Sequence, residues 1–382
     1  MKIEFWSSTE YGGFLEGLMR ELRGQGFEAA QRFHISEASY RAARSPQARL
    51  FLRLRQYVIY PLYLSVCLLV RRLKGLFDRF RGRSPSDDVC VVSTNTFFAP
   101  LLATFLHPRV VHLVYDLFPE AMIHAGKWPA DSIKVRAVRW ITRKTLQRAD
   151  LNVFLGQRLQ AYVTSIHGPV ANSRVIPVGA DQSLFPEPPA KASDSVGAGR
   201  APTVFYCGNL GHMHEIQTLM DVWASDPGPL RWCFRCSGPK RAALEAGVKS
   251  LPESSRNCIQ IGNSLAQADW VEAMTGAEVA LVTMAPGAEQ VVMPSKTYSA
   301  MMAGQAILAI APEASDLVEL IKAADCGWWV EPGDIAALAD TLEVITSEPS
   351  ILEARRSKAY QYAQAHFGQD ILANTWGEVL KA

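Results

Sequence analysis

The chain has 382 residues, more than one hydrophobic core usually serves, so we expect two domains. Its 48% hydrophobic and 20% charged residues are typical of a soluble globular protein rather than a membrane-spanning one. The formal charge of +2 conceals an asymmetry, because residues 1–185 hold 25 Lys/Arg against 14 Asp/Glu (net +11) and the remainder holds 14 against 23 (net −9). A basic half joined to an acidic half suggests two domains with different partners.

The odd cysteine count and the hydropathy pattern limit the cellular setting. Seven cysteines form no disulfide framework, which argues against a secreted, oxidised protein. Cys233 and Cys236 form a C-x-x-C within an expected strand, where residues three apart point to opposite faces, so we interpret them as core residues. The N-terminus begins with a strand rather than a signal peptide. The longest apolar run, residues 57–70, is too short to cross a membrane.

In the first half, short apolar strands alternate with helices. A strand at 3–7 is followed by a glycine loop and a helix at 14–24 with apolar residues at helical spacing. This unit opens a doubly wound α/β fold, and strands without polar alternation suit a parallel sheet covered on both faces. Further strands are expected at 88–93, 110–115, 151–155 and 174–177, and further helices at 100–106 and 158–166.

Residues 186–200 are rich in Pro, Ala, Ser and Gly, which predicts a linker. Beyond it the strand–loop–helix pattern begins again. Strands are expected at 203–207, 232–236, 279–282, 306–310 and 327–330, and helices at 216–223, from Ser295 or Lys296, at 335–345 and as one long helix at 350–381.

The pattern predicts two Rossmann-like domains that face each other across a cleft. We place the N-terminal domain at 1–185 and the C-terminal domain at 201–365. The helix at 366–382 is expected to pack back on the N-terminal domain. Ligands of such sheets bind at the carboxyl ends of the strands, so the loops there are the candidate sites.

Two glycine loops follow the first strand of each half. Gly12-Gly13 and the segment Gly208-Asn209-Leu210-Gly211 would let backbone N–H groups approach a phosphate, although a plain turn explains them equally well. His214 can donate a hydrogen bond to such an anion. His212 and His214 lack further ligands at usable spacing, so we do not expect a metal site.

The most informative residue is Lys296, after Pro294-Ser295 and at the start of an expected helix. A positive charge beside the positive end of a helix dipole is unfavourable unless both share an anion, and a bound diphosphate would supply one. The alternative is a lysine that extends into solvent. Ser295 is also an ordinary helix cap.

Two carboxylates, Asp116 and Glu120, follow the strand at 110–115. At a strand's carboxyl end they can bind sugar hydroxyls or help to deprotonate an acceptor. They can equally serve as the polar start of a helix near Pro119.

The segment 41–83 combines a basic composition with an apolar centre. It holds eleven Lys/Arg against one acid, Asp78, and tyrosines lie among the aliphatic residues of 57–70. Basic flanks on an apolar helix predict binding to a membrane surface, although Pro61 would kink that helix. A buried helix with basic flanks and a nucleic-acid site are the alternatives, and the separation of aromatic from basic residues disfavours nucleic acid.

Over nearly its whole length the chain resembles the retaining family 4 glycosyltransferases of the GT-B fold, in particular those of bacterial surface polysaccharide assembly. The order and spacing of its motifs carry the resemblance. These motifs are Tyr11-Gly12-Gly13, Asp116-Leu117-Phe118-Pro119-Glu120, Arg148-Ala149-Asp150 to Phe154, Arg174 to Asp181, Tyr206 to Gly211 with His214, Pro294 to Tyr298, Ala303-Gly304 and Glu331-Pro332-Gly333-Asp334.

The resemblance implies a nucleotide-diphosphate sugar, with UDP as the expected nucleotide, and no metal or other cofactor. It implies that Lys296 and the Gly208–Gly211 loop bind the diphosphate, that Gly12-Gly13 close over it, and that Glu289 lies near the donor sugar. Asp116 and Glu120 would lie near the acceptor. That acceptor would be a lipid-linked saccharide, such as one on undecaprenyl diphosphate, at the cytoplasmic face of the membrane. The full donor set would be Gly12, Gly13, Gly208, Asn209, Gly211, His214, Ser295, Lys296, Tyr298 and Ser299.

The chain departs from the family pattern in two places. The family often has two glutamates eight positions apart, and here Val291 and Ser299 stand at that spacing, with Glu289 nearby. An Arg/Lys pair is absent where His212 and His214 stand. Two alternatives therefore stay open: a GT-B-fold sugar-nucleotide epimerase, and a non-catalytic protein that binds a nucleotide sugar or acts as a scaffold.

Overall fold

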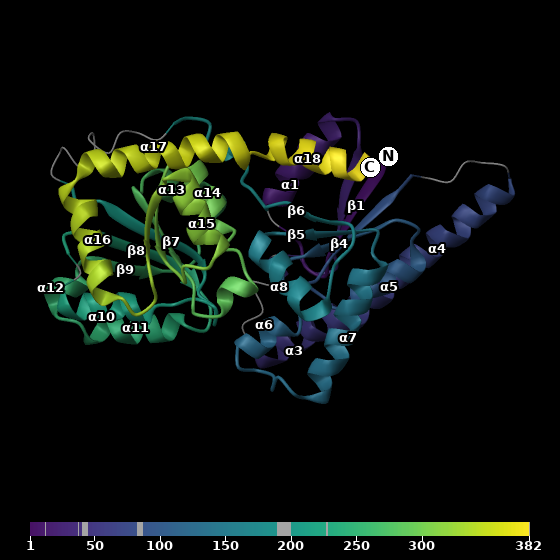
Figure 1. Cartoon of the computed structure of the whole chain (residues 1–382), viewed down its shortest axis with the longest axis horizontal. Helices are drawn as coiled ribbons and strands as arrows, with labels where there is room; N and C mark the ends of the chain where they lie inside the picture. Colours follow the sequence, from purple (N-terminus) through teal and green to yellow (C-terminus); the bar gives the residue numbers. More distant parts are fainter. Residues whose placement is uncertain are drawn as a thin grey trace. The chain divides into compact units, whose positions relative to one another are not determined.

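The computed structural model describes residues 1–11, 13–36, 38–39, 45–81, 87–188, 200–226 and 228–381. The chain forms two compact units (Figure 1). The first comprises Met1–Pro177 together with Gln369–Ala382, and the second comprises Val178–Gly368. Most of the predicted linker, residues 189–199, lies outside the described part of the chain.

The first unit contains a six-stranded parallel sheet in the order β2-β1-β3-β4-β5-β6. β3 and β4 are buried along their whole length, as expected for strands covered on both faces. The order reverses between β1 and β3, so their carboxyl ends form a switch point where loops can diverge around a ligand. The strands are β1 Lys2–Trp6, β2 Glu28–Arg32, β3 Val89–Ser93, β4 Val110–Val114, β5 Leu151–Phe154 and β6 Ser173–Val175.

Helices cover both faces of this sheet. The C-terminal helix α18 packs against α1, and the ring of Trp376 meets that of Phe5 in β1 at 5.8 Å. The helices are α1 Gly13–Gly24, α3 Pro46–Leu54, η1 Arg55–Ile59, α4 Tyr60–Phe80, α5 Ala99–Leu106, α6 Glu120–His124, α7 Ile133–Arg148, α8 Gln157–His167 and α18 Gln369–Lys381.

Proline 61 does not interrupt the helical segment 46–80, because a π-helical turn, η1, precedes it. In this turn the Tyr60 N–H donates to the Arg55 carbonyl, five residues earlier. In the same pattern residue 61 would donate to the Gln56 carbonyl, but proline has no backbone N–H. The Thr96 hydroxyl donates to that Gln56 carbonyl instead, at 3.0 Å. The helix therefore continues into α4 without an unsatisfied backbone group at the proline.

The second unit contains a six-stranded parallel sheet in the order β12-β11-β10-β7-β8-β9, with its switch point between β7 and β10. Trp223 of α10 and Trp232 of β8 lie at the centre of its core, with ring centroids 5.2 Å apart. The strands are β7 Thr203–Asn209, β8 Arg231–Ser237, β9 Ile259–Gly262, β10 Val279–Thr283, β11 Ala306–Ile310 and β12 Gly327–Val330. The helices are η2 Gln182–Leu184, α10 Gln217–Ser225, α11 Arg241–Ser250, α12 Glu253–Arg256, α13 Gln267–Thr275, η3 Ala288–Gln290, α14 Lys296–Met302, α15 Asp316–Ala324, α16 Ile335–Ser347 and α17 Pro349–His366.

The single helix predicted at 350–381 is wrong, since the chain forms α17 and α18 with a break at Phe367 and Gly368. At the break the Ala180 N–H donates to the Phe367 carbonyl, and this pairing takes residues 367–368 out of the helix. The chain passes from the second unit to the first at this point. All seven cysteines are free thiols.

Candidate functional site

In the second unit, two loops meet at the carboxyl ends of β7 and β10. The Ala285 N–H, beyond β10, donates to the Met213 carbonyl beyond β7 at 2.8 Å. The Leu210 N–H donates to the Ser237 carbonyl at the end of β8, which fixes the loop after β7. The glycine loop thus lies at the switch point of its sheet, where doubly wound folds bind their ligands.

Lys296, the first residue of α14, reaches back to this loop. Its Nζ lies 2.8 Å from the Tyr206 hydroxyl and 3.2 Å from Nε2 of His214, and 4.0 Å from the centre of the Tyr206 ring. A Cβ atom at Gly208 would be 3.6 Å from the same Nζ, and Gly208 has a φ of +134° that favours glycine. Burial lowers the pKa of the lysine to about 7. The lysine therefore does not extend into solvent.

The imidazole of His214 is held between the loop and the lysine. Its Nδ1 lies 3.2 Å from the Gly211 N–H, and its backbone carbonyl accepts a hydrogen bond from Lys240. Burial, reinforced by the charge of Lys296, lowers the pKa of His214 to about 3. The ring is neutral at physiological pH.

The remaining donor residues predicted from sequence occupy different environments. Ser295 is exposed and its hydroxyl does not cap α14, whereas Asn209 is exposed beside Gly211. Ser299 is half-buried on the first turn of α14. Tyr298 is 3% exposed and packs its ring against Phe367 at 4.6 Å, which makes it a core residue.

Glu289 lies in η3, between β10 and α14, and is half-buried. Its Oε2 is buried without a hydrogen-bond partner within the described ranges. The hydroxyl of Thr297, the residue after Lys296, is in the same condition. Buried polar atoms are normally paired, so Glu289 and Thr297 each keep an unsatisfied oxygen in the described part of the chain.

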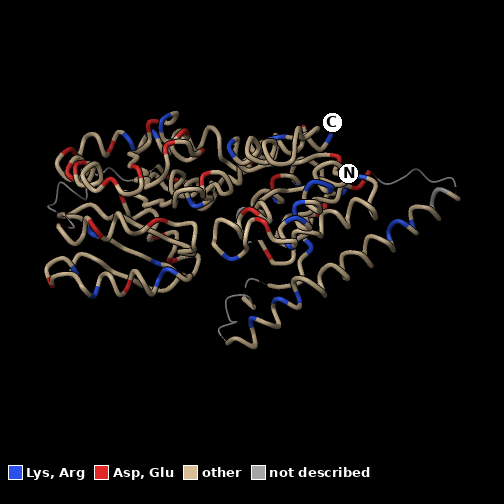
Figure 2. The backbone as a smooth tube through the Cα atoms, turned by 60° about the horizontal axis from the view of Figure 1, so that its bottom comes forward, with Lys and Arg blue, Asp and Glu red and all other residues tan. Residues whose placement is uncertain are grey.

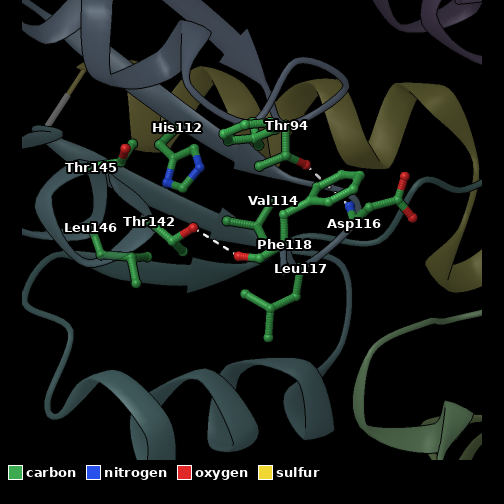
Figure 3. Close-up of a pocket in the computed structure, with 10 residues that line it drawn as sticks. Thr94, His112, Val114, Asp116, Leu117, Phe118, Thr142, Thr145 and Leu146 are labelled. Atoms are coloured by element: carbon green, nitrogen blue, oxygen red, sulfur yellow. Dashed lines mark hydrogen bonds between the residues drawn. The ribbon is translucent and has the colours of Figure 1, made fainter. Parts of the chain in front are cut away.

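In the first unit, Asp116 directly follows β4, and its carboxylate points away from the side chain of His112 (Figure 3). Its backbone N–H and that of Tyr115 both donate to the Thr94 hydroxyl at 3.1 Å. The side chain is accessible to solvent, while desolvation by the surrounding protein raises the carboxyl pKa. A solvent-accessible carboxylate with a raised pKa suits a general base.

Asp116 is one of the residues that line a small cavity, together with side chains of β4 and α7 (Figure 3). It has room for about one water molecule, which excludes a sugar. His112 lines it and hydrogen-bonds to Asn152 at 2.9 Å, and burial lowers its pKa to about 4. We interpret this cavity as part of the core rather than as a substrate pocket.

Glu120, the other predicted carboxylate, begins α6 and is 1% exposed. Its Oε1 accepts a hydrogen bond from Arg139 of α7 at 2.8 Å, in an ion pair that joins the two helices. Oε2 is buried without a partner in the part of the chain described. The structure does not bring Glu120 to the surface at which Asp116 is exposed.

Two polar residues of the first switch point, Thr9 and Asn95, were not predicted from the sequence. The Asn95 amide donates to the Thr9 hydroxyl at 2.9 Å and its carbonyl oxygen accepts from the Tyr11 hydroxyl, which joins the loops after β1 and β3. The Tyr11 ring lies 5.0 Å from that of Tyr115, beside Asp116. These residues follow β1 and β3, the two neighbouring strands of the switch point, and that position was the available signal.

Two further predictions concern glycines and metals. Gly12 lies outside the described residues, and Gly13 begins α1. Within the described ranges, no group of three His, Cys, Asp or Glu side chains is arranged to hold a metal ion.

The helical segment 46–80 presents an apolar surface to solvent, which we call the α3–α4 face. In α4 its residues recur at helical spacing, whereas Tyr60, Leu64 and Leu68 on the opposite side pack into the core. Basic residues recur along α4, which projects beyond the rest of its unit (Figure 2). Across the described residues, no helix has the length and hydropathy to cross a membrane. The face comprises Leu50, Phe51, Leu54, Val58, Leu62, Tyr63, Val66, Leu69, Val70, Leu73, Leu76, Phe77 and Phe80.

Two units, each built on a six-stranded parallel sheet with its loop site at a switch point, define the GT-B fold. No protein-family model matches the chain. It is similar to the probable glycosyltransferase WbjE of Pseudomonas aeruginosa, with 26% identity over 294 residues that cover 73% of this chain and 72% of that protein.

Solved structures share the fold over the full length. Sucrose-phosphate synthase from Thermosynechococcus elongatus matches with a TM-score of 0.69 and 16% identity, over 100% of this chain and 98% of that one. Alr3699/HepE of Anabaena, in complex with UDP-glucose, matches with a TM-score of 0.70 and 16% identity, over 100% and 99%. WaaG, a glycosyltransferase involved in lipopolysaccharide biosynthesis, matches at 0.64 and 12%, over 99% of each chain.

Proposed function

We propose that the protein is a glycosyltransferase that moves a sugar from a nucleotide-diphosphate sugar to a lipid-linked saccharide in cell-surface polysaccharide biosynthesis. The observation that carries the proposal is Lys296, a half-buried residue whose amine is held at the switch point of the second sheet by Tyr206 and His214. A partly desolvated cation site beside glycine backbone is suited to a diphosphate, which combines two negative groups in a small volume.

The donor is proposed to be a UDP-sugar. Support comes from the similar fold of Alr3699/HepE, whose structures contain UDP and UDP-glucose, and from the name of the relative WbjE. Lys296 and the N–H groups of the Gly208–Gly211 loop would bind the diphosphate. The unpaired Oε2 of Glu289 would accept a hydrogen bond from a donor-sugar hydroxyl.

Asp116 is proposed to bind the acceptor hydroxyl. Transfer breaks the bond between the anomeric carbon and the diphosphate oxygen and forms a bond to the acceptor oxygen. The acceptor proton leaves to the departing diphosphate, on the same face, so that anomeric configuration is retained. Lys296 and backbone N–H groups would stabilise the charge that develops on the diphosphate, so no metal ion is required in this proposal.

The α3–α4 face is proposed to hold the protein at the cytoplasmic face of a membrane, where a lipid-linked acceptor such as an undecaprenyl diphosphate saccharide is available. An exposed apolar helix face flanked by basic residues fits an interface with anionic lipid headgroups. This surface favours a transferase over a soluble sugar-nucleotide epimerase, which needs no membrane acceptor.

A screen of UDP-, GDP- and dTDP-sugars by thermal shift tests the donor site, because a ligand that binds only the folded state stabilises it by about 2.7 kcal/mol at 100 times its Kd. We expect UDP-sugars to raise the Tm most. Product analysis with membrane lipid extract as acceptor then separates transfer from binding alone and from epimerisation. If no nucleotide sugar raises the Tm, the proposed donor site is refuted.

A further inference from the structure

The hydrogen bonds around His214 determine where its proton resides. The Gly211 backbone N–H lies 3.2 Å from Nδ1 and is a donor in every protonation state. Nδ1 must therefore present a lone pair. A neutral imidazole carries one proton, so that proton is on Nε2.

The position of this proton constrains Lys296. Nε2 lies 3.2 Å from the lysine Nζ, and an Nε2–H group can only donate. An ammonium group has three donors and no lone pair, so a charged Lys296 would place an N–H of Nζ against the Nε2–H of His214, and no hydrogen bond could form. A neutral amine has the lone pair that accepts the Nε2–H.

The hydroxyl of Tyr206, the second group that contacts Nζ, is also compatible with a neutral amine. The Tyr206 hydroxyl donates to the Asn209 carbonyl at 3.1 Å, so its oxygen is available to accept from Nζ at 2.8 Å. A neutral Lys296 amine thus accepts one hydrogen bond and donates another. Each of these hydrogen bonds has one donor and one acceptor without an ammonium ion.

The charged and titratable groups around Nζ also favour a neutral amine. The titratable groups facing Nζ are Tyr206 and Cys207 of β7, His214 of the following loop and Cys236 of β8, with the cation Lys240 beyond His214. Burial lowers the lysine pKa to about 7, and burial raises the pKa of the Cys236 thiol, so that thiol is neutral at this pH. No carboxylate is among these groups.

We infer that His214 is a positioning residue that holds the Lys296 amine neutral, and that binding of a nucleoside diphosphate adds one proton to this amine. The inference rests on the proposed donor site and goes beyond it. The proton comes from solvent and forms a new N–H bond on the Nζ lone pair, after which Nζ leaves Nε2 and donates to a phosphate oxygen. Nucleotide binding is therefore coupled to proton uptake at Lys296, and the contact with His214 sets the free energy needed to protonate the amine.

Isothermal titration with UDP at pH 8, in phosphate and in Tris buffer, measures this coupling. The two buffers differ in ionisation enthalpy, so the difference in heat counts the protons taken up. For a free amine of pKa about 7, we expect about 0.9 proton per UDP at pH 8 and about half a proton at pH 7. Affinity should fall about tenfold per pH unit above pH 7, because the amine must first be protonated.

Two variants separate the roles of the residues. Lys296→Arg keeps a cation that stays protonated, so proton uptake should fall close to zero. His214→Gln offers a carbonyl that can accept from an ammonium group, so uptake at pH 8 should fall to less than half of the wild-type value. A purely structural role for His214 would weaken binding and leave the proton count unchanged, and that result would overturn its assignment.

A measurement on the protein without nucleotide distinguishes failure of this inference from failure of the donor site. In ¹³C-lysine spectra, the Cε resonance missing from Lys296→Arg should titrate near pH 7, and the ¹⁵N shifts of His214 should show a protonated Nε2. A lysine midpoint near pH 10, or UDP binding with equal heats in both buffers, overturns the inference while leaving the donor site intact. A lysine midpoint near pH 7 without any nucleotide binding would support the neutral amine and refute the nucleotide as its ligand.

Discussion

Arg71 of α4 pairs with Glu4 of β1 in a two-pronged ion pair, with Nη2 2.8 Å from Oε1 and Nη1 on Oε2. Glu4 is 1% exposed, and Lys2 and Arg32 also lie against its carboxylate, at 3.1 and 3.4 Å. The pair fastens the helix of the α3–α4 face to the central sheet. The guanidinium of Arg71 is therefore occupied by Glu4, and we do not expect it to contact lipid headgroups.

Arg71→Met should lower the free energy of unfolding by about 2 kcal/mol. Removing one partner of a buried ion pair costs about 3–5 kcal/mol when it leaves an uncompensated charge, and the two remaining cations moderate that cost. Urea unfolding followed by circular dichroism gives the value. In Glu4→Gln/Arg71→Met most of the loss should be recovered, and a double variant as unstable as the sum of its single variants would contradict the pairing.

The stability contributed by Glu4 should depend on pH. Burial by itself raises the Glu4 pKa, but the hydrogen bonds and charges of Arg71 and Lys2 outweigh it and lower the pKa to about 2. A folded-state pKa below the ordinary value of 4.5 means that this stability, on the order of 3 kcal/mol, is complete above about pH 4.5 and is lost as the pH falls toward 2. The gap in unfolding free energy between wild type and Glu4→Gln should narrow from pH 6 to pH 3. A constant gap would refute the assignment.

The buried strands were predictable from sequence because parallel strands covered on both faces are short apolar runs. β2, with the sequence EAAQR, is a partly exposed edge strand and lacks that signal. α7 has a basic sequence with few apolar positions and was not predicted either. The break between α17 and α18 depends on a hydrogen bond to Ala180, far away in sequence, so no local pattern reveals it.

The candidate site shows the same division. Lys296 was identifiable from the loop position and its positive charge. Its partner Tyr206 lies 90 residues earlier, and although Tyr206 was part of a predicted motif, no local pattern indicated its contact with Lys296. Glu120 and Asp116 had the same predicted role, but Glu120 is buried and pairs with Arg139 of α7. Local sequence indicates which loops can bind a ligand, and tertiary contacts decide which side chains reach it.

Lys296→Ala should weaken UDP binding about 100-fold, because it removes the cation proposed to meet the diphosphate, and charge-assisted hydrogen bonds are among the strongest in proteins. Isothermal titration at pH 7 measures the change. Lys322→Ala is the matched control, since this lysine of the same unit pairs with Glu313 at the surface and should leave the Kd unchanged. Equal affinities for both variants would rule out a role for Lys296 in donor binding.

Asp116→Asn should lower kcat on the order of 10²-fold, because it removes the carboxylate proposed to bind and orient the acceptor hydroxyl, and should change the donor Kd less than threefold. Asp131→Asn, an exposed position in the same unit, is the control and should retain full activity. Because the Asp116 pKa is raised, wild-type kcat/KM should fall with decreasing pH at a value above the ordinary aspartate range. A variant that loses donor affinity with kcat intact would move Asp116 to the donor site.

Substitutions on the α3–α4 face should abolish vesicle binding without unfolding the protein. Leu62→Ser/Val66→Ser/Leu69→Ser removes three exposed apolar side chains of α4, and each contributes about 1–2 kcal/mol when it leaves water. We expect cosedimentation with phosphatidylglycerol vesicles to fall at least tenfold. Ile335→Ser/Ile351→Ser, at exposed positions of the second unit, is the control and should sediment as the wild type does.

The charged part of the same interaction should respond to salt. Arg72→Gln/Lys74→Gln removes two exposed cations of α4 and should weaken vesicle binding by about 1 kcal/mol per charge at low ionic strength. The difference from wild type should shrink in 0.5 M salt, where charges are screened within about 4 Å, whereas the defect of the serine variant should persist. Arg71 stays unchanged in this test because it holds Glu4. Vesicle binding that is insensitive to both sets of substitutions would show that this face does not hold the protein at the lipid surface.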